Sequence, residues 1–241
     1  MTTQPLFYKN VVPLNKEKHS KLFLAPIKDF KHTKDTNSVY IAAIEFPKAA
    51  KEYPIVFAKG AGDEIFPVVL LGLKDQDNLF LDKKGEWLAN YIPAYVRRYP
   101  FILASSVNQE NKEFAVCIDK GYEGFNTKKK GTQLFDDDGK ESELLQNALK
   151  FLKEYQNHIR FTRAFCKNLD ELGLLEPMQA KAEFKDGKTM ALRGFMGISR
   201  DKLKALDPAR LAEMVKQNYM DLVYAHLNSL DNIQNLIKKL H

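Results

Sequence analysis

The sequence predicts an α+β fold: an antiparallel sheet built from hairpins, with an amphipathic central helix and a helical C-terminus. Strand-like segments occur in adjacent pairs, and their short polar turns favour antiparallel neighbours because a parallel crossover needs about a dozen residues. Apolar residues recur at helical spacing over 145–166 and again over 211–240. The 241 residues are 44% hydrophobic and 28% charged, which is the balance of a chain that buries a core.

Strands are expected to dominate the first third of the chain. Residues 1–38 mix prolines and charged residues with short apolar pieces, and we expect an extended arm with one or two short strands. The apolar segment 40–46 is typical of a strand, and Pro47 behind it can open a short helical turn. Three further strands are expected, each bounded by turn residues, at 55–58, 66–73 and 78–81.

A helix and a second hairpin are expected next. Residues 85–98 have helical character, which Pro93 interrupts because proline cannot donate a backbone hydrogen bond. Apolar segments at 101–107 and 113–119 flank five polar residues, a pattern that predicts two antiparallel strands. Residues 121–140 are rich in Gly, Lys and Asp and are expected to form an exposed connector.

A capped helix and a third hairpin follow the connector. Ser142 can accept a backbone hydrogen bond at the start of the amphipathic segment, which is long enough for about six helical turns. Asp186-Gly187 is a strong hairpin signal because these residue types tolerate the backbone angles of a two-residue turn. We therefore expect strands at 180–185 and 188–195. After them we expect a long C-terminal helix that starts at Asp207-Pro208 and that residues 228–232 can divide in two.

The connector is also the best candidate for a domain boundary. On that division, residues 1–120 form a mostly antiparallel β region with short helices. Residues 121–241 then form a helix, a β-hairpin and the C-terminal helices. One continuous domain is equally compatible with the length, since a chain of 241 residues can bury one large core or two modest ones.

Charge and cysteine content restrict the partner and the compartment. The net charge of +6 is spread along the chain, which suits an acidic partner but lacks the basic patch of a nucleic-acid-binding protein. Cys117 and Cys166 stand alone among apolar residues, so neither a disulfide framework nor a zinc site is indicated. The N-terminal residues lack an export-signal pattern, and no apolar run approaches the roughly 20 residues of a membrane span. We therefore expect a cytoplasmic protein without a membrane span.

The sequence contains no motif for a metal, a cofactor or a catalytic group. None of the five histidines is paired with another at ligand spacing, and His226, on the apolar stripe of the last helix, is expected to be a hydrogen-bonded core residue. Residues 136–139 look like a calcium loop, but the glycine comes too early and an acidic turn is the better interpretation. We therefore expect no catalytic residues, no cofactor and no metal.

The candidate site lies where aromatic and guanidinium groups gather, at residues 91–100. Tyr95, Arg97 and Arg98 can clamp a carboxylate or phosphate, or anchor a partner protein. Glu45 lies in an expected strand and, if buried, needs a partner that Arg97 or Arg98 can supply. The alternative interpretation is a structural ion pair with core tyrosines that lock the helix onto the sheet. The ligand- or partner-binding candidates are Glu45, Tyr53, Trp87, Tyr95, Arg97 and Arg98.

Several segments together resemble the bacterial SapC family. In the N-terminal half these are Ile44-Glu45-Phe46, Glu52-Tyr53-Pro54-Ile55-Val56-Phe57, Leu70-Leu71-Gly72-Leu73, Asn78-Leu79-Phe80, Trp87 and the run from Tyr91 to Phe101. In the C-terminal half they are Gly194-Phe195, Leu203, Leu206, Tyr224-Ala225-His226-Leu227 and Ser229-Leu230. The family is named for a connection with bacterial surface-layer proteins, which implies an accessory role at the cell surface and supplies no catalytic residues.

Two hypotheses from different classes follow. The first is a non-enzymatic accessory factor that binds another protein, of the surface-layer or export machinery, through Tyr95, Arg97 and Arg98. The second is an enzyme, or an enzyme-associated substrate-binding module, in which Glu45 and the arginines line a pocket. Nucleic acid is the weakest partner class, and the oligomeric state stays open. The resemblance also implies an alternative localisation at the cell surface, which the protein would reach through a dedicated secretion system.

Overall fold

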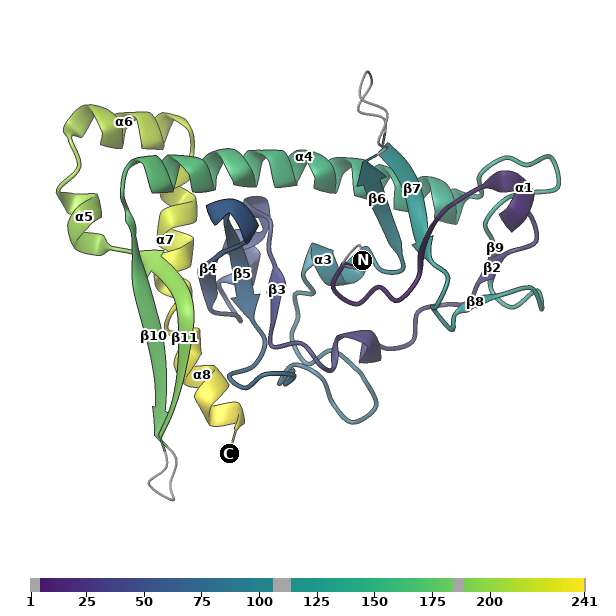
Figure 1. The fold of residues 1–241 in the computed structure, drawn as a ribbon, viewed down its shortest axis with the longest axis horizontal. Helices are drawn as coiled ribbons and strands as arrows, with labels where there is room; N and C mark the ends of the chain where they lie inside the picture. The colour runs from purple at the N-terminus through teal and green to yellow at the C-terminus, as the bar shows by residue number, and fades with distance from the viewer. Residues whose placement is uncertain (1–4, 106–113, 184–188, 241) are drawn as a thin grey trace.

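The structure, a computed structural model, describes residues 5–105, 114–183 and 189–240. Every strand pair in these ranges is antiparallel, and three sheets lie along one long helix (Figure 1). The α+β class, the hairpins, the central helix and the helical C-terminus predicted from the sequence are therefore confirmed.

The largest sheet has five strands. Their order across the sheet is β10 (Leu175–Glu183), β11 (Thr189–Ile198), β4 (Ile55–Lys59), β5 (Ile65–Leu70) and β3 (Ser38–Tyr40). The central strands β4 and β5 are buried on both faces, and the largest core cluster forms around them. The expected turn at Asp186-Gly187 lies outside the described residues.

Two smaller sheets lie toward the opposite end of the molecule (Figure 1). The first has the order β1 (Val11–Pro13), β7 (Phe114–Asp119) and β6 (Phe101–Ser105). The second has the order β8 (Phe125–Asn126), β2 (Phe23–Leu24) and β9 (Thr132–Gln133). The N-terminal arm thus supplies two short strands, as expected. The segment expected to be an exposed connector also contributes two, because β8 and β9 both pair with β2.

The central helix α4 (Glu143–Glu171) packs against sheets toward both ends of the molecule. Its first turn is capped as expected, since the Ser142 hydroxyl accepts from the Leu145 N–H. At 29 residues it has about eight turns rather than six, because the apolar stripe continues past Cys166 to Leu169. Figure 1 shows it running from β10 to a little past β7, and it contacts both β5 and β6.

The C-terminal residues form four helices. They are α5 (Arg200–Lys204), α6 (Pro208–Lys216), α7 (Tyr219–Ser229) and α8 (Asn232–Lys239). Asp207 caps α6 through the Ala209 N–H, and the chain turns again between α7 and α8, both as the sequence indicates. A further break was not predicted. It falls at Asn218, whose positive φ of 58° no helix interior adopts.

Short helices fill the connections. They are α1 (Lys16–His19), α2 (Phe46–Ala49) and α3 (Ala94–Arg97), with 3₁₀ turns at Lys31–Thr33, Ala43–Glu45 and Ala61–Asp63. The expected strand at 40–46 is therefore wrong beyond Tyr40. The Glu45 side chain accepts from the Ala42 N–H, which closes a turn, and Pro47 then starts α2.

Two other expected elements are also wrong. Residues 78–81 are not a strand. Asn78 donates to Thr33, which is distant in the sequence, and accepts from the Phe80 N–H, and Leu81 makes an isolated antiparallel bridge to Trp87. Residues 85–92 are not helical, because Glu52 accepts from the N–H groups of Asn90 and Tyr91 and holds them extended. Of the expected helix only α3, after Pro93, is present.

Candidate functional site

Four of the site residues predicted from the sequence, Glu45, Tyr95, Arg97 and Arg98, lie at α3, which packs against β3, whereas Tyr53 and Trp87 lie apart from it. α3 is only four residues long, and its two arginines point to different places. Arg97 is exposed, whereas Arg98, the residue after the helix, is partly buried. The predicted cluster is therefore two separate sites, and each is described below.

Glu45 is buried and serves the fold. Only 5% of the residue is exposed. One carboxylate oxygen accepts from the Tyr91 hydroxyl at 2.6 Å and from the Ala94 N–H at 2.7 Å, and the other accepts from the Ala42 N–H at 2.9 Å. The prediction that an arginine pairs with Glu45 is wrong, because these three donors take the place of the guanidinium.

The electrostatics of Glu45 follow from its surroundings. Burial raises the pKa of its carboxyl group, and the hydrogen bonds from Tyr91, Ala94 and Ala42 oppose that rise. Arg97 lowers the pKa further, but only as a neighbouring charge. The carboxylate thus ties the Ala43–Glu45 turn to the first residue of α3, and this tie positions both arginines.

Tyr53 lies in the core, and Trp87, which is partly buried, packs against it. The Trp87 Nε1–H donates to the Tyr53 hydroxyl at 2.7 Å, and that hydroxyl donates to the Tyr91 carbonyl. Tyr53 is fully buried, and its ring packs on Phe80. Both side chains hold the segment that leads to α3, and neither borders the two sites described below.

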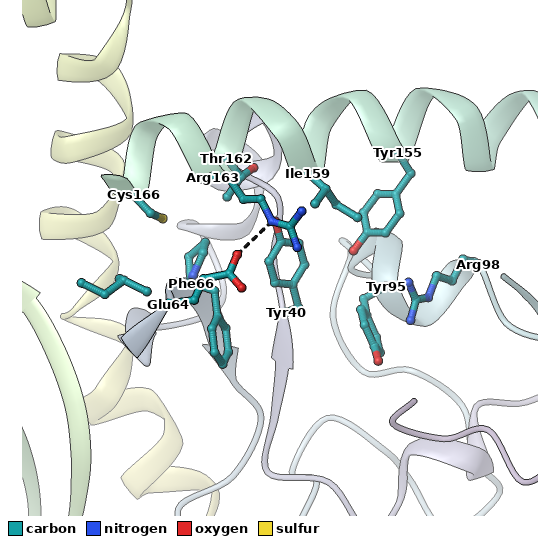
Figure 2. Close-up of a pocket in the computed structure, with 12 residues that line it drawn as sticks. Tyr40, Glu64, Phe66, Tyr95, Arg98, Tyr155, Ile159, Thr162, Arg163 and Cys166 are labelled. Atoms are coloured by element: carbon teal, nitrogen blue, oxygen red, sulfur yellow. Dashed lines mark ion pairs between the residues drawn. The ribbon is translucent and has the colours of Figure 1, made fainter. Parts of the chain in front are cut away.

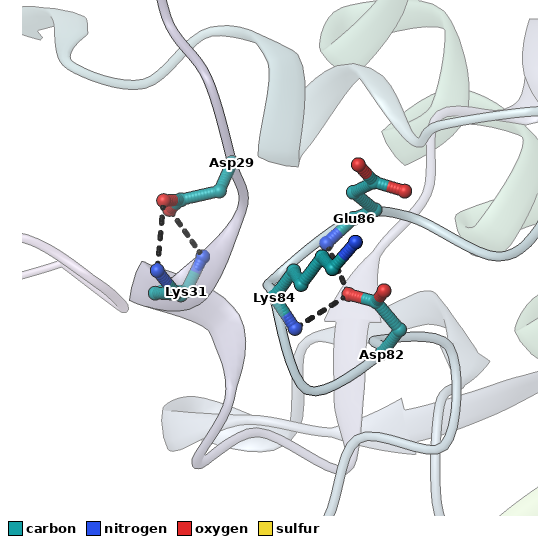
Figure 3. A network of polar contacts seen from close by, with 5 residues as sticks. All are labelled: Asp29, Lys31, Asp82, Lys84 and Glu86. Carbon is teal, nitrogen blue, oxygen red and sulfur yellow. Dashed lines mark hydrogen bonds and ion pairs between the residues drawn. The ribbon is translucent and has the colours of Figure 1, made fainter.

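The turn before Trp87 is held by aspartates (Figure 3). One Asp82 carboxylate oxygen accepts from the N–H groups of Lys84 and Glu86, at 2.9 and 2.7 Å. The Gly85 carbonyl accepts from the Phe30 N–H at 2.8 Å, so this turn is joined to the neighbouring segment, where Asp29 bonds Lys31. Gly85 has a φ of 90°, and an added Cβ would lie 2.6 Å from the Lys31 side chain.

Arg97 lies on the surface at a pocket of about 300 Å³. Its Nε–H donates to the Ile92 carbonyl at 2.9 Å, and its guanidinium lies 5.2 Å from the centre of the Phe151 ring. Ile44, which is 56% exposed, and Lys48 line the same pocket. We call this set, Ile44, Lys48, Arg97 and Phe151, the Arg97 face. Glu45 borders the pocket, with its carboxylate oxygens bound as described.

Arg98 reaches into a second pocket, of about 270 Å³, between α4 and strands β3 and β5 (Figure 2). Its guanidinium lies 3.8 Å from the centre of the Tyr95 ring, and the rings of Tyr8 and Tyr155 lie within 6 Å. We call this the Arg98 pocket. Its lining includes Tyr40, Phe66, Tyr95, Arg98, Tyr155, Ile159, Arg163 and Cys166.

Sequence reasoning missed two residues of the Arg98 pocket, Tyr40 and Tyr155. Tyr40 ends β3, and Tyr155 comes from the apolar stripe of α4. A tyrosine on an apolar stripe needs a partner for its hydroxyl, which was the available signal. The buried cysteines and His226 lie in the core, as expected. The acidic segment is a turn, as predicted, in which Asp136 accepts from the Lys140 N–H.

Two searches of the described residues bear on the class of site. Within 5–105, 114–183 and 189–240, no three His, Cys, Asp or Glu side chains are grouped as metal ligands would be. In the same ranges, no helix combines the length and the apolar character needed to cross a membrane.

These observations define an α+β protein in which the predicted site is an exposed arginine face beside a separate arginine–tyrosine pocket. The chain belongs to the SapC family, which it matches over residues 14–236. No curated protein and no solved structure matches it.

Proposed function

We propose that this chain is a non-enzymatic accessory factor that binds a bacterial surface-layer or other cell-surface protein through the Arg97 face. The observation that carries the proposal is the state of Arg97. Its guanidinium is exposed and held in place by the Ile92 carbonyl and the Phe151 ring. In the described part of the chain it makes no ion pair.

An arginine held in this way suits a partner protein. Its side chain is already ordered, so binding costs less conformational entropy than for a free side chain. The exposed Ile44 beside it supplies an apolar contact, and arginines next to apolar groups are frequent among the residues that dominate interfaces. The expected contact on the partner is an acidic side chain with an apolar neighbour, in keeping with the net charge of +6.

Glu45 favours binding over catalysis at this face. A general acid or base must reach a substrate proton with a free oxygen. Both oxygens of Glu45 instead accept hydrogen bonds from the chain itself. The alternative of an enzyme-associated module with Glu45 in its pocket therefore has less support. The compartment belongs to the same proposal: the chain acts in the cytoplasm, or at the cell surface after export by a dedicated secretion system.

Affinity capture with a matched variant tests the proposal. The purified chain is used as bait in extracts and surface fractions of the native cell, and captured proteins are identified by mass spectrometry. We expect one surface-layer or cell-surface protein, which rebinds the bait in purified form. Arg97→Ala should weaken that binding about tenfold or more, as expected for a central interface arginine.

The control is Arg210→Ala on α6, where the arginine is also exposed and pairs with Glu213 on the surface. It removes the same charge and should leave capture unchanged. Equal capture by both variants would show that the Arg97 face is not the contact. Failure to capture any cell-surface protein would overturn the proposed function itself.

A further inference from the structure

Three buried polar atoms that belong to residues of the Arg98 pocket lining have no hydrogen-bond partner in the described ranges. They are the hydroxyl groups of Tyr40 and Tyr155 and the Nε of Arg98, and all three atoms are buried. Tyr155 as a whole is only 4% exposed. Thr162, another residue of the lining with a hydroxyl group, is satisfied, since it donates to the His158 carbonyl and accepts from the Ala43 N–H. The unpaired Tyr155 hydroxyl group lies on the Arg98 side of the pocket, whereas that of Tyr40 lies next to Arg163 (Figure 2).

Unpaired buried polar atoms are uncommon in folded proteins, because a group taken out of water without a partner destabilises the fold. Here all three atoms belong to groups that can donate. Burial raises the pKa of both tyrosine hydroxyl groups well above 10, so both stay protonated at neutral pH. The Arg98 guanidinium, which lies near Tyr155, is always charged. One cation and two hydroxyl donors are the groups that recognise an anion.

We propose that the Arg98 pocket binds a small monocarboxylate that carries one aromatic or branched aliphatic group. Tyr155 borders both pockets, but Arg98 lines only this one and Arg97 lines only the other, so the proposal is independent of the Arg97 face.

The charge of the pocket selects a single negative charge. Arg98 takes part in no ion pair among the described residues, so one positive charge is available. The other cation in the lining, Arg163, is neutralised by Glu64 at 2.9 Å (Figure 2). A phosphate dianion would keep an unbalanced charge in a mostly apolar site, which is costly, whereas a carboxylate is balanced by Arg98.

The walls select the rest of the ligand. Phe66, Ile159 and Cys166 line the pocket beyond the polar end and present an apolar surface (Figure 2). A cavity of about 150 Å³ holds a benzene ring. The 270 Å³ of this pocket therefore suit one ring or branched chain with a short acid group. An amino acid suits it less, since Glu64, the one carboxylate in the lining, is already paired with Arg163.

Calorimetry with phenylpropanoate tests the proposal directly. We expect saturable binding to the wild-type protein at concentrations up to about 10 mM. Three compounds should each bind about tenfold more weakly or not at all. Phenylpropanol lacks the negative charge, phenylalanine adds an ammonium group, and inorganic phosphate lacks the apolar group. Equal binding of the alcohol or of phosphate would overturn the assignment, and so would the absence of binding by phenylpropanoate.

Two variants assign the binding to the pocket. Arg98→Met keeps the length of the side chain without its charge and should weaken binding at least about tenfold. Tyr155→Phe removes a single oxygen, so it is expected to fold normally, and it should weaken binding about fivefold through loss of one hydrogen bond. Unchanged binding in Tyr155→Phe would show that the ligand sits elsewhere.

The matched control is Arg97→Ala, which should leave phenylpropanoate binding unchanged. In turn, Arg98→Met should leave partner capture unchanged, since Arg98 does not line the pocket at the Arg97 face, so the proposed function and this inference fail independently. Loss of phenylpropanoate binding in Arg97→Ala would overturn the assignment to Arg98.

Discussion

His226 joins three elements through one imidazole ring. Its Nε2 accepts from the Ile198 N–H at 3.0 Å, and its Nδ1 lies 2.8 Å from the Ile55 carbonyl, to which it donates. The ring thereby ties α7 to β11 and β4. This bonding requires the neutral imidazole, since the protonated ring has no acceptor for the Ile198 N–H.

The pH dependence of stability follows from this ring. Burial lowers the pKa of His226 to about 4, below its ordinary value of 6.5. The unfolded chain therefore takes up a proton first as pH falls, so the stabilising effect is present above pH 6.5 and is lost between there and about 4. We expect the free energy of unfolding to fall by about 2 kcal/mol between pH 7 and 5 from His226 alone.

Urea unfolding at the two pH values measures the effect. His226→Gln can make the same two hydrogen bonds without titrating, so its stability should fall less over this interval. His32, buried against Tyr99 with its pKa also lowered to about 4, contributes in the same direction and leaves a residual slope. A slope identical to wild type in His226→Gln would contradict the assigned protonation state.

Predictions for single residues were correct where the question was only whether a side chain lies in the core. The apolar periodicity placed His226 and Cys166 in the core, and both are there. Glu45 was expected to need a partner, but the partner came from backbone N–H groups that no residue type announces. The Arg98 pocket could not be predicted from the sequence for another reason. It joins residues 40, 98 and 155, whose proximity depends on how α4 crosses the sheet.

At the scale of elements, the N-terminal arm is fastened by one carboxylate. Asp119, at the end of β7, is fully buried and accepts from the N–H groups of Lys9, Asn10 and Gly121 and from the Tyr99 hydroxyl. Burial acts to raise the pKa of Asp119, but these bonds outweigh it and lower the pKa. The carboxylate therefore holds β1 beside β7 in its ionised form.

Replacing this carboxylate should release the arm. Asp119→Asn puts an amide donor where donors already point, and we expect a loss of about 2–3 kcal/mol of unfolding free energy. Hydrogen exchange should become about tenfold faster at the amides of 8–12, while α7 keeps its protection. Asp137→Asn, in the exposed acidic turn, is the matched control and should change neither quantity. Exchange that is unchanged at the arm would show that other contacts suffice to hold it.

Elements were predictable where the signal was local. The caps at Ser142 and Asp207 and the hairpin strands of β6 and β7 followed from residue types at fixed spacing. The segment 40–46 failed because a strand-like composition was overruled by a side-chain cap and a proline. Elements whose form depends on tertiary hydrogen bonds, such as 78–92, leave no periodic pattern in the sequence.

At the scale of the molecule, α4 is the element that both ends share. Leu145 and Leu152 pack into the core cluster beside β6 and β7, whereas Phe165 and Leu169 pack into the cluster around β4 and β5. A rigid helix that is buried at both ends couples the two clusters, because neither can lose its packing without exposing part of α4. We therefore propose that the chain is one cooperative unit, although its sequence allows a boundary at residues 121–140.

Paired cavity variants test this coupling. Leu145→Ala and Leu169→Ala each remove a fully buried side chain and should each cost about 2–5 kcal/mol. If α4 makes one unit, each variant should lower the midpoint of the same single transition, followed both by Trp87 fluorescence and by circular dichroism. Trp87 lies near the Leu169 cluster, so its signal responds to Leu145→Ala only if the destabilisation is transmitted through the helix. Two separate transitions, with the midpoint measured by Trp87 fluorescence unchanged in Leu145→Ala, would instead show an independent folding unit on each side of the connector.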